Sequence, residues 1–422
     1  MRTRRSFWQF SAAEARTHAL LTAIALWVMA VAVLTLGSTF HDPFGQLKWN
    51  DFVHFYALGD VARHGPVAHL YDDAALHRDQ GALVPASAHD FFFAVYPPQV
   101  ALVFAPFTHL PYLAAGAVWA LVTITVFAAA VWLAWRPVRD TLGRASLVVA
   151  AAAAFPPFQN LVLNGQTTAV PLVAFAGGAL ALARGRKLLA GVALGLLFVK
   201  PQFGLVLAVV TLACREWSIM AGLALSACAQ AAVVVGLLGR TAIVEYLQVL
   251  PRLGGLRTAL EPKADAMQSL AAVTGLLPGP AAALTWVAAS AVVCWIVVRV
   301  WRSAAPVHVR TAALTIGSML VNPHVNLYDA AVIAPALVSL TGWVEAQDET
   351  WAGLRERWRL ALYALYAFLL FPTAKITGLQ LAPLVLLGMM YAVWRAATAG
   401  APVNAEASIP PVCLRAADSG PR

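Results

Sequence analysis

Apolar segments long enough to cross a lipid bilayer dominate this chain. The first runs from Ala19 to Leu36, and further apolar runs recur until about residue 396. A transmembrane helix needs roughly 20 such residues. Charged residues make up 12% of the 422 residues, against roughly a quarter in soluble domains. The sequence therefore predicts an all-α, polytopic integral membrane protein whose transmembrane domain covers residues 17–396.

The basic residues predict how the chain crosses the membrane. The net charge is +9, and the cations occur in short clusters between apolar runs, as cytoplasmic loops of membrane proteins do. This placement accounts for the charge without a nucleic-acid partner. It puts residues 1–16 in the cytoplasm before an uncleaved signal anchor, and residues 397–422 in a disordered cytoplasmic tail. The clusters are Arg2/Arg4/Arg5, Arg136/Arg139/Arg144, Arg184/Arg186/Lys187, Arg299/Arg302/Arg310, Arg355/Arg357/Arg359 and Arg395.

Alternation of these clusters across the membrane predicts about 11 to 13 transmembrane helices. It also predicts an external loop at residues 38–95 and a second external segment near residues 239–280. Residues 96–112 must not cross the membrane if Arg136 is inside and Asp51 is outside. We therefore expect a re-entrant segment there; if it does cross, the loop after Trp135 is external.

Two interruptions of the apolar pattern predict turns at the outer face. One is "VKPQF", where a single helix would leave Lys200 near the centre of the membrane at high energetic cost. Proline disfavours helical geometry in the residue before it, so we expect two short helices that turn at Lys200. The other is the turn near Asn164, Gly165 and Gln166.

Polar side chains gather at this outer face, and such groups at membrane depth usually face a cavity and carry function. We expect them to line a groove open to the outside. They are Asp51, His54, Tyr56, Asp60, Asn164, Gln166, Lys200, Gln268, His324, Asn326 and Asp329.

Structural roles compete with functional ones for several of these residues. Asp51 fits either a helix N-cap or a base at the membrane interface. Lys200 fits either an interfacial lysine that extends to water or a contact to an anionic phosphate. His324 fits a hydrogen-bonded structural group or a catalytic one. Tyr96 and Trp119 are expected to be ordinary packing residues.

Several other chemistries find little support. The sequence has no nucleotide-binding or zinc-protease motif and no detectable internal repeat. The four cysteines are scattered, which favours neither a disulfide framework nor a zinc site. The acidic pair Asp72 and Asp73 is weak support for a metal site without further ligands.

Four segments, in their order and spacing, resemble glycosyltransferase family 87. They are "NDFVHFYALGDVARHGPVAHLYD", "YPPQVALVFAPFTHLP", "NGQTTAVPLVAFAGGALALARGRKLLAGVALGLLFVKPQFGLVL" and "DAMQSLAAVTGLL". The best-known members of the family are bacterial polyprenyl-phosphate-mannose-dependent α-mannosyltransferases and an arabinofuranosyltransferase. The resemblance extends from about residue 17 to residue 396.

The resemblance implies the GT-C membrane fold, with a catalytic aspartate in the first external loop, where Asp51 stands. It also implies that His324 lies close to the reaction centre. Met267 replaces the usual asparagine before Gln268, and the acidic pair of many metal-dependent GT-C enzymes is absent around Asp51. We therefore expect no cofactor and leave a divalent metal uncertain. The expected donor-phosphate and substrate-binding residues are Lys200, Gln166, Asn164, Tyr56 and Gln268.

The resulting expectation is an inverting glycosyltransferase in the plasma membrane of a bacterium. It would move a sugar, with mannose favoured, from a polyprenyl-phosphate donor to a hydroxyl of a glycan or glycolipid acceptor at the external face. A secondary transporter or lipid flippase is the alternative, because broken helices and mid-membrane polar residues are also typical of transporters. A non-catalytic membrane scaffold is a third possibility.

Overall fold

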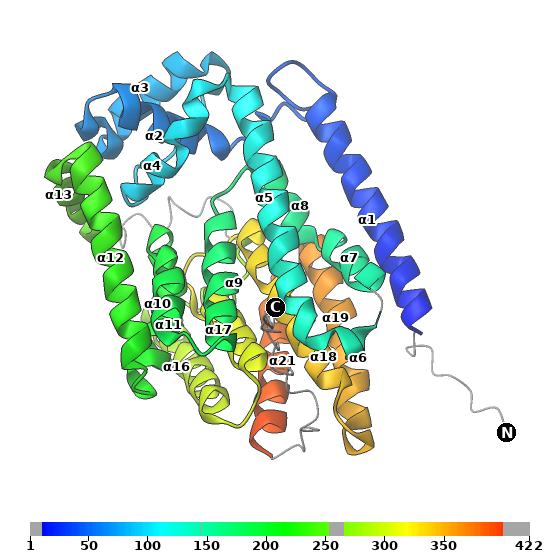
Figure 1. Ribbon diagram of the computed structural model, residues 1–422. Helices are drawn as coiled ribbons and strands as arrows, with labels where there is room; N and C mark the ends of the chain where they lie inside the picture. Colours follow the sequence, from blue (N-terminus) through cyan, green and yellow to red (C-terminus); the bar gives the residue numbers. More distant parts are fainter. Residues whose placement is uncertain (1–10, 144, 253–265, 400–422) are drawn as a thin grey trace, which may run out of the picture.

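The computed structural model describes residues 11–143, 145–252 and 266–399, and these residues form helices joined by short connections (Figure 1). Within them the only β-pairing is an isolated bridge between His41 and Leu47. The prediction of an all-α polytopic membrane protein is thus confirmed. The predictions for residues 1–16 and for the tail fall largely outside the described residues, as does part of the second external segment.

Among the described residues, five helical segments are long and apolar enough to cross a membrane. The bent pair α7 (Ala145–Ala153) and α8 (Pro156–Asn164) makes a sixth if counted as one span. These six and the five shorter apolar helices of 10–17 residues together make eleven. The expected 11 to 13 spans are reached only if every short helix crosses, so that number stays a prediction. The five are α1 (Ala12–Thr35), α5 (Tyr112–Trp135, extended by η4 and α6 to Leu142), α12 (Trp217–Leu238), α16 (Pro280–Arg302) and η9 with α18 (Leu327–Glu345).

The remaining helices complete the bundle and the layer at one of its ends. They are α2 (Phe52–His64), η1 (Val67–Tyr71), α3 (Asp73–Leu83), η2 (Pro85–Ser87), α4 (Gln99–Phe104), η3 (Ala105–His109), η4 (Arg136–Val138), α6 (Arg139–Leu142), α9 (Ala169–Ala183), α10 (Lys187–Leu194), η5 (Gly195–Val199), η6 (Pro201–Gly204), α11 (Leu205–Ala213), α13 (Arg240–Val249), η7 (Leu250–Arg252), α15 (Leu270–Thr274), α17 (Val307–Val321), η9 (Leu327–Ile333), α18 (Ala334–Glu345), η10 (Glu349–Trp351), α19 (Ala352–Leu370), α20 (Thr373–Thr377) and α21 (Ala382–Thr398).

Helix α17 lies at the centre of the bundle. All of its residues except Val307, His308 and Arg310 are buried, and it packs against α9, α11, α16, α18 and α21. A helix that is apolar on every side is expected in such a fully enclosed position. Its C-terminal end therefore holds Asn322, and the residues that follow, in a fixed place.

Proline breaks two helices near the level of the candidate site. Helices α7 and α8 are bent by 54°, and Pro156 occupies the first turn of α8, where its missing N–H costs no hydrogen bond. The chain breaks again at Lys200, whose ψ of 76° lies outside the helical range, between η5 and η6. The predicted pair of short helices on either side of Lys200 is present.

Helices α2, α3 and α4 form a layer at one end of the bundle (Figure 1). Residues 96–112 fold into α4 and η3, which pack against α2 and are each too short to cross a bilayer. The close approach depends on Gly59, since a Cβ there would lie 2.6 Å from the Phe104 backbone. The acidic pair is structural: Asp72 caps α3, and Asp73 accepts a hydrogen bond from the Ala94 N–H.

Candidate active site

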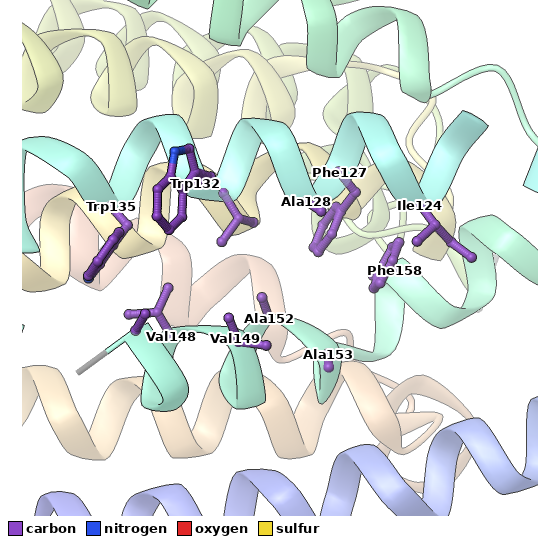
Figure 2. Close-up of a pocket in the computed structure, with 12 residues that line it drawn as sticks. Ile124, Phe127, Ala128, Trp132, Trp135, Val148, Val149, Ala152, Ala153 and Phe158 are labelled. Carbon is purple, nitrogen blue, oxygen red and sulfur yellow. The ribbon is translucent and has the colours of Figure 1, made fainter. Parts of the chain in front are cut away.

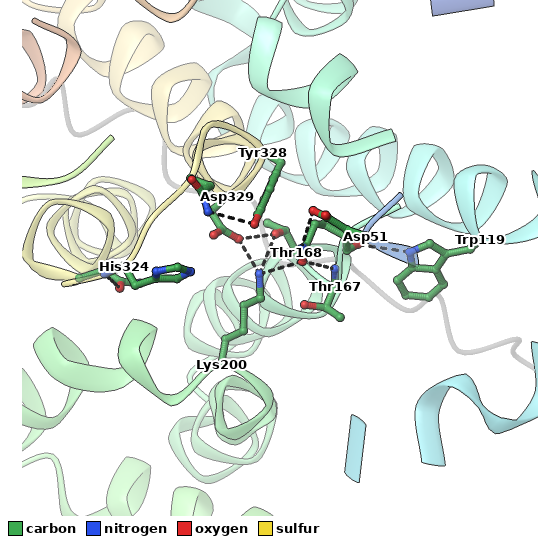
Figure 3. A network of polar contacts seen from close by, with 11 residues as sticks. Asp51, Trp119, Thr167, Thr168, Lys200, His324, Tyr328 and Asp329 are labelled. Atoms are coloured by element: carbon green, nitrogen blue, oxygen red, sulfur yellow. Dashed lines mark hydrogen bonds and ion pairs between the residues drawn. The ribbon is translucent and has the colours of Figure 1, made fainter. Parts of the chain in front are cut away.

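A buried polar network lies where the layer of α2 meets the bundle (Figure 3). Four parts of the chain contribute to it: the start of α2, the turn between α8 and α9, the break at Lys200, and the start of η9. Segments far apart in the sequence therefore meet here. The residues that carry the network are Asp51, Gln166, Thr168, Lys200 and Asp329.

The turn after α8 is built on a glycine. Gly165 has a φ of +69°, in the left-handed region that glycine adopts without a steric penalty. A Cβ on Gly165 would also lie 2.6 Å from the Cβ of Phe52. This contact brings the turn directly against the first residue of α2, and it places the side chain of Gln166 beside Asp51.

Asp51 occupies the N-cap position of α2, but its side chain makes no capping hydrogen bond. Its Oδ2 instead accepts a hydrogen bond of 2.8 Å from Nε2 of Gln166. An aspartate that only caps a helix would accept from the backbone N–H groups of the first turn. Of the two roles considered for Asp51, the geometry therefore favours the functional one.

Lys200 and Asp329 form a buried ion pair. Nζ of Lys200 lies 2.7 Å from Oδ1 of Asp329, and the two side chains are only 4% and 2% exposed. Oγ1 of Thr168 donates a further hydrogen bond of 2.6 Å to the same carboxylate oxygen. A buried charge is tolerated when it is paired and hydrogen-bonded in this way.

Gln166 connects the ion pair to Asp51. Its Oε1 accepts hydrogen bonds from Nζ of Lys200 at 3.4 Å and from the N–H of Thr167 at 3.2 Å. These acceptor contacts orient the amide so that its NH₂ group points to Asp51. The network thus places one ammonium group between two carboxylates, Asp51 and Asp329.

His324 lies beside this network. Its imidazole points toward Lys200 and Asp329 (Figure 3), and its backbone N–H donates to Oδ1 of Asn322 at 2.9 Å. The ring of Tyr328 approaches from η9, with Nζ of Lys200 5.5 Å from its centroid, within the range of a cation–π contact. The predicted histidine is therefore close to the ion pair.

The other three predicted site residues lie outside the network. The side chain of Asn164 donates to the Asn160 carbonyl within its own helix. The hydroxyl of Tyr56 donates to the Leu110 carbonyl at 2.7 Å. Gln268 is held against the His324 segment, because its backbone N–H donates to the Val325 carbonyl at 2.8 Å.

Sequence reasoning missed several members of the site. It places Asp329 at the outer face but not among the site residues, although a carboxylate at membrane depth is the available signal. It treats Trp119 as a packing residue, yet Nε1 of Trp119 donates to the Gln166 carbonyl at 3.2 Å. No local pattern points to Thr168.

Tyr96 is a second residue that the sequence assigns to packing. Burial raises the pKa of the Tyr96 hydroxyl, and the charges of Asp329 and Asp51 raise it further. The phenol therefore remains protonated at neutral pH and can donate a hydrogen bond near both carboxylates. Tyr96 thus belongs to the site as well.

His54, one turn after Asp51, is buried at 2% exposure. Its ring stacks on Phe92 at a centroid distance of 5.3 Å, and neither ring nitrogen has a hydrogen-bond partner among the described residues. Burial lowers the pKa of His54 to about 3, so the imidazole is neutral. The described residues contain no group of three or more His, Cys, Asp or Glu side chains that could hold a metal ion.

Comparison with known proteins gives one match. The sequence model of glycosyltransferase family 87 matches residues 93–323, more than half of the 422 residues. This range contains Gln166 and Lys200, but it begins after Asp51 and ends before His324. No curated protein and no solved structure matches the chain. On the family match, this chain belongs to glycosyltransferase family 87 and is a glycosyltransferase.

Proposed function

We propose that this glycosyltransferase moves a sugar, with mannose favoured, from a polyprenyl-phosphate donor to a hydroxyl of a glycan or glycolipid. The reaction takes place at the external face of the plasma membrane of a bacterium. The observation that carries the proposal is the contact between Asp51 and Gln166. It holds a carboxylate, unused as a helix cap, at the edge of a buried polar network at one end of an apolar bundle.

In the proposed reaction, Asp51 accepts the proton of the acceptor hydroxyl. The hydroxyl oxygen forms a bond to the anomeric carbon of the sugar while the bond from that carbon to the donor phosphate oxygen breaks. The leaving group is polyprenyl phosphate, which carries the bonding electrons away and needs no general acid. A single displacement inverts the configuration at the anomeric carbon.

Lys200 is proposed to stabilise the leaving phosphate, with His324 as a second donor. An ammonium group has three N–H donors, and Asp329 takes one of them at 2.7 Å. The contacts to Gln166 and Thr168 are longer, at 3.4 and 3.5 Å. A phosphate oxygen can therefore replace either of them, while the ion pair with Asp329 keeps the ammonium in place.

Gln268 is proposed to bind substrate as well. Its Oε1 is buried and has no hydrogen-bond partner among the described residues, and a buried acceptor left unpaired costs free energy. A sugar hydroxyl can satisfy it. For Tyr56 and Asn164, whose side chains are bonded to backbone carbonyls, substrate binding stays a prediction. The proposed chemistry requires no divalent metal.

The first experiment measures the release of free polyprenyl phosphate by purified protein in lipid, supplied with several polyprenyl-phosphate sugars and a membrane extract as acceptor. A general base contributes about 10²–10⁴-fold to a rate. Asp51→Asn is therefore expected to lower turnover by that factor and to leave donor binding largely intact.

Asp60→Asn is the matched control, since Asp60 lies on the same helix but pairs with His64 at the surface. It is expected to keep the wild-type rate. Full turnover by Asp51→Asn would show that Asp51 is not the base. No release by the folded wild-type protein with any donor would reject the polyprenyl-phosphate donor.

A further inference from the structure

A large cavity lies between α1, α7, α18 and α19, apart from the polar network. Its volume is about 690 Å³, within the range of about 300–1,000 Å³ typical of small-molecule sites. Ala15 and Ala19 of α1 line one wall, Ala151 of α7 and Leu337 of α18 line others, and Leu370 of α19 lines a fourth. Small and aliphatic side chains thus form its body.

Helix α7 stands between this cavity and a smaller one. The smaller cavity, of about 160 Å³, lies against Phe127, Trp132 and Trp135 of α5; Figure 2 shows α7 between α5 and the helices α19 and α1. Val148 and Ala152 line both cavities. Helix α7 is therefore loosely packed on two sides, and the space beside it is a property of this part of the bundle.

The cavity exists because α1 diverges from the bundle. Within the described chain, α1 buries only Ala23, Leu26 and Ala30. Its first eleven residues, 12–22, include none of these three, and that part of the helix faces the cavity. In a membrane, an apolar space of this kind is filled by hydrocarbon, because empty space forfeits dispersion contacts with its walls.

One end of the cavity is charged. Arg359 of α19 forms a two-bond ion pair with Glu345 of α18, and the hydroxyl of Tyr363 lies 3.2 Å from Nδ1 of His18. All four residues line the cavity. Glu14 lies in the first turn of α1, where its carboxylate accepts from the backbone N–H of Ser11, itself a lining residue. The cavity is therefore amphipathic, with an apolar body and an end that carries both signs of charge.

We propose that this cavity binds one zwitterionic glycerophospholipid of the phosphatidylethanolamine class. Its acyl chains occupy the apolar space between α1 and α19. Its phosphate accepts from Arg359, which uses Nε and one terminal nitrogen to bind Glu345 out of five N–H donors. Its ammonium group lies near Glu345 and Glu14. Two carboxylates beside one guanidinium suit a headgroup with both charges better than a purely anionic one.

The lipid site is separate from the transferase site. Pro156, at the start of α8, lines the cavity, whereas Asn164, at the end of α8, precedes the turn that carries Gln166. The nine residues of α8 separate the two sites, which is about 14 Å at 1.5 Å per residue. The bound phospholipid is therefore a resident lipid, and the proposal does not depend on which sugar donor the enzyme uses.

The test is native mass spectrometry of purified protein after delipidation, with added phosphatidylethanolamine, phosphatidylglycerol or polyprenyl phosphate. The wild type is expected to retain one phosphatidylethanolamine. Ala19→Trp, which fills the cavity, is expected to retain at least ten-fold less. Leu21→Trp is the matched control, since Leu21 lies on the same helix, is 62% exposed and does not line the cavity.

A second variant tests the headgroup. Glu345→Gln with Arg359→Gln removes both charges and leaves the apolar walls, so it is expected to bind lipid without preferring phosphatidylethanolamine over phosphatidylglycerol. Equal retention by Ala19→Trp and Leu21→Trp, both with wild-type melting temperatures, would overturn the proposal. Wild-type preference for phosphatidylglycerol or polyprenyl phosphate would overturn the assigned headgroup. If Ala19→Trp fails to fold, Ala15→Trp takes its place.

Discussion

Lys200 is the residue on which the charge balance of the site depends. Its ammonium is the only cationic side chain within the network of described residues, and Asp329 neutralises it at 2.7 Å, while Gln166 links it to Asp51. Removing one member of a buried pair leaves an uncompensated charge and costs about 3–5 kcal/mol. Folding and catalysis must therefore be separated experimentally before Lys200 is assigned a role in either.

A double substitution makes that separation. Lys200→Met is expected to destabilise the protein, because Asp329 is left charged and buried. Adding Asp329→Asn removes the second charge and is expected to restore most of the melting temperature. If Lys200 contacts the donor phosphate, the stable double variant stays inactive in the polyprenyl phosphate release assay. Wild-type turnover by the double variant would limit Lys200 to a structural role.

His54 predicts a pH dependence of stability. Burial lowers its pKa in the folded protein to about 3, from an ordinary value of 6.5. Below pH 6.5 the unfolded chain binds a proton that the folded chain does not, so this stability is complete above pH 6.5 and is lost as the pH falls toward 3. The slope is about 1.4 kcal/mol per pH unit.

The measurement compares the wild type with His54→Leu. Between pH 7.5 and pH 5.0 the wild type is expected to lose about 2 kcal/mol through His54 alone, and its melting temperature should fall more than that of His54→Leu. At neutral pH, His54→Leu is expected to be at least as stable, since it removes two buried nitrogens that lack partners among the described residues. Parallel pH profiles for the two proteins would contradict the buried neutral imidazole.

At the scale of elements, the turn between α8 and α9 positions the site. Gly165 satisfies two demands at once, a left-handed backbone and a close approach to Phe52. Gln166 and Thr168 follow it and supply two members of the network. The distance between the turn and α2 therefore controls the contact of Gln166 with Asp51.

Gly165→Ala is expected to destabilise the protein and to lower turnover, because the added methyl group strains the backbone and collides with Phe52. Gly185→Ala is the matched control: Gly185 also has a positive φ, of +71°, but a Cβ added there would meet no other atom within 4 Å. Melting temperature and polyprenyl phosphate release are measured for both. Equal losses in the two variants would mean that backbone strain alone, and not contact with Phe52, explains the effect.

The turns of this fold were predictable and its long-range pairs were not. Proline after Lys200 and glycine before Gln166 act on the backbone of their immediate neighbours, so the sequence showed both breaks. Asp329 and Lys200 are 129 residues apart, and Thr168 reaches Asp329 from 161 residues away. Such contacts depend on how α9, η9 and the Lys200 break pack together, which no local pattern specifies.

At the scale of the whole molecule, the two ends of the bundle differ. The layer of α2, α3 and α4 covers one end, and η4, α6 and the loop after α18 lie at the other (Figure 1). The polar network is at the first end and arginines gather at the second. The positive-inside rule then predicts that the network lies outside the cytoplasm, and the family match supports a transferase over the transporter alternative.

Cysteine labelling tests this orientation. Phe44, 79% exposed, lies in the loop after α1, and Asp140, whose side chain is 95% exposed, lies in α6 at the opposite end. In a cysteine-free background, Phe44→Cys is expected to react with a membrane-impermeant maleimide in intact cells. Asp140→Cys should react only after permeabilisation. The reverse pattern would invert the proposed topology.

The few contacts of α1 have a consequence for the order of events during biosynthesis. Nε1 of Trp27 donates to the Ala153 carbonyl, 126 residues later in the chain, and Gln159 donates to the Leu26 carbonyl, 133 residues earlier. At about 5–20 residues per second of synthesis, α1 waits about 6 to 25 seconds in the bilayer before these partners exist. The segment that carries Asp51 follows α1 directly, so the ribosome has made α7 and α8 before that segment can take its final place.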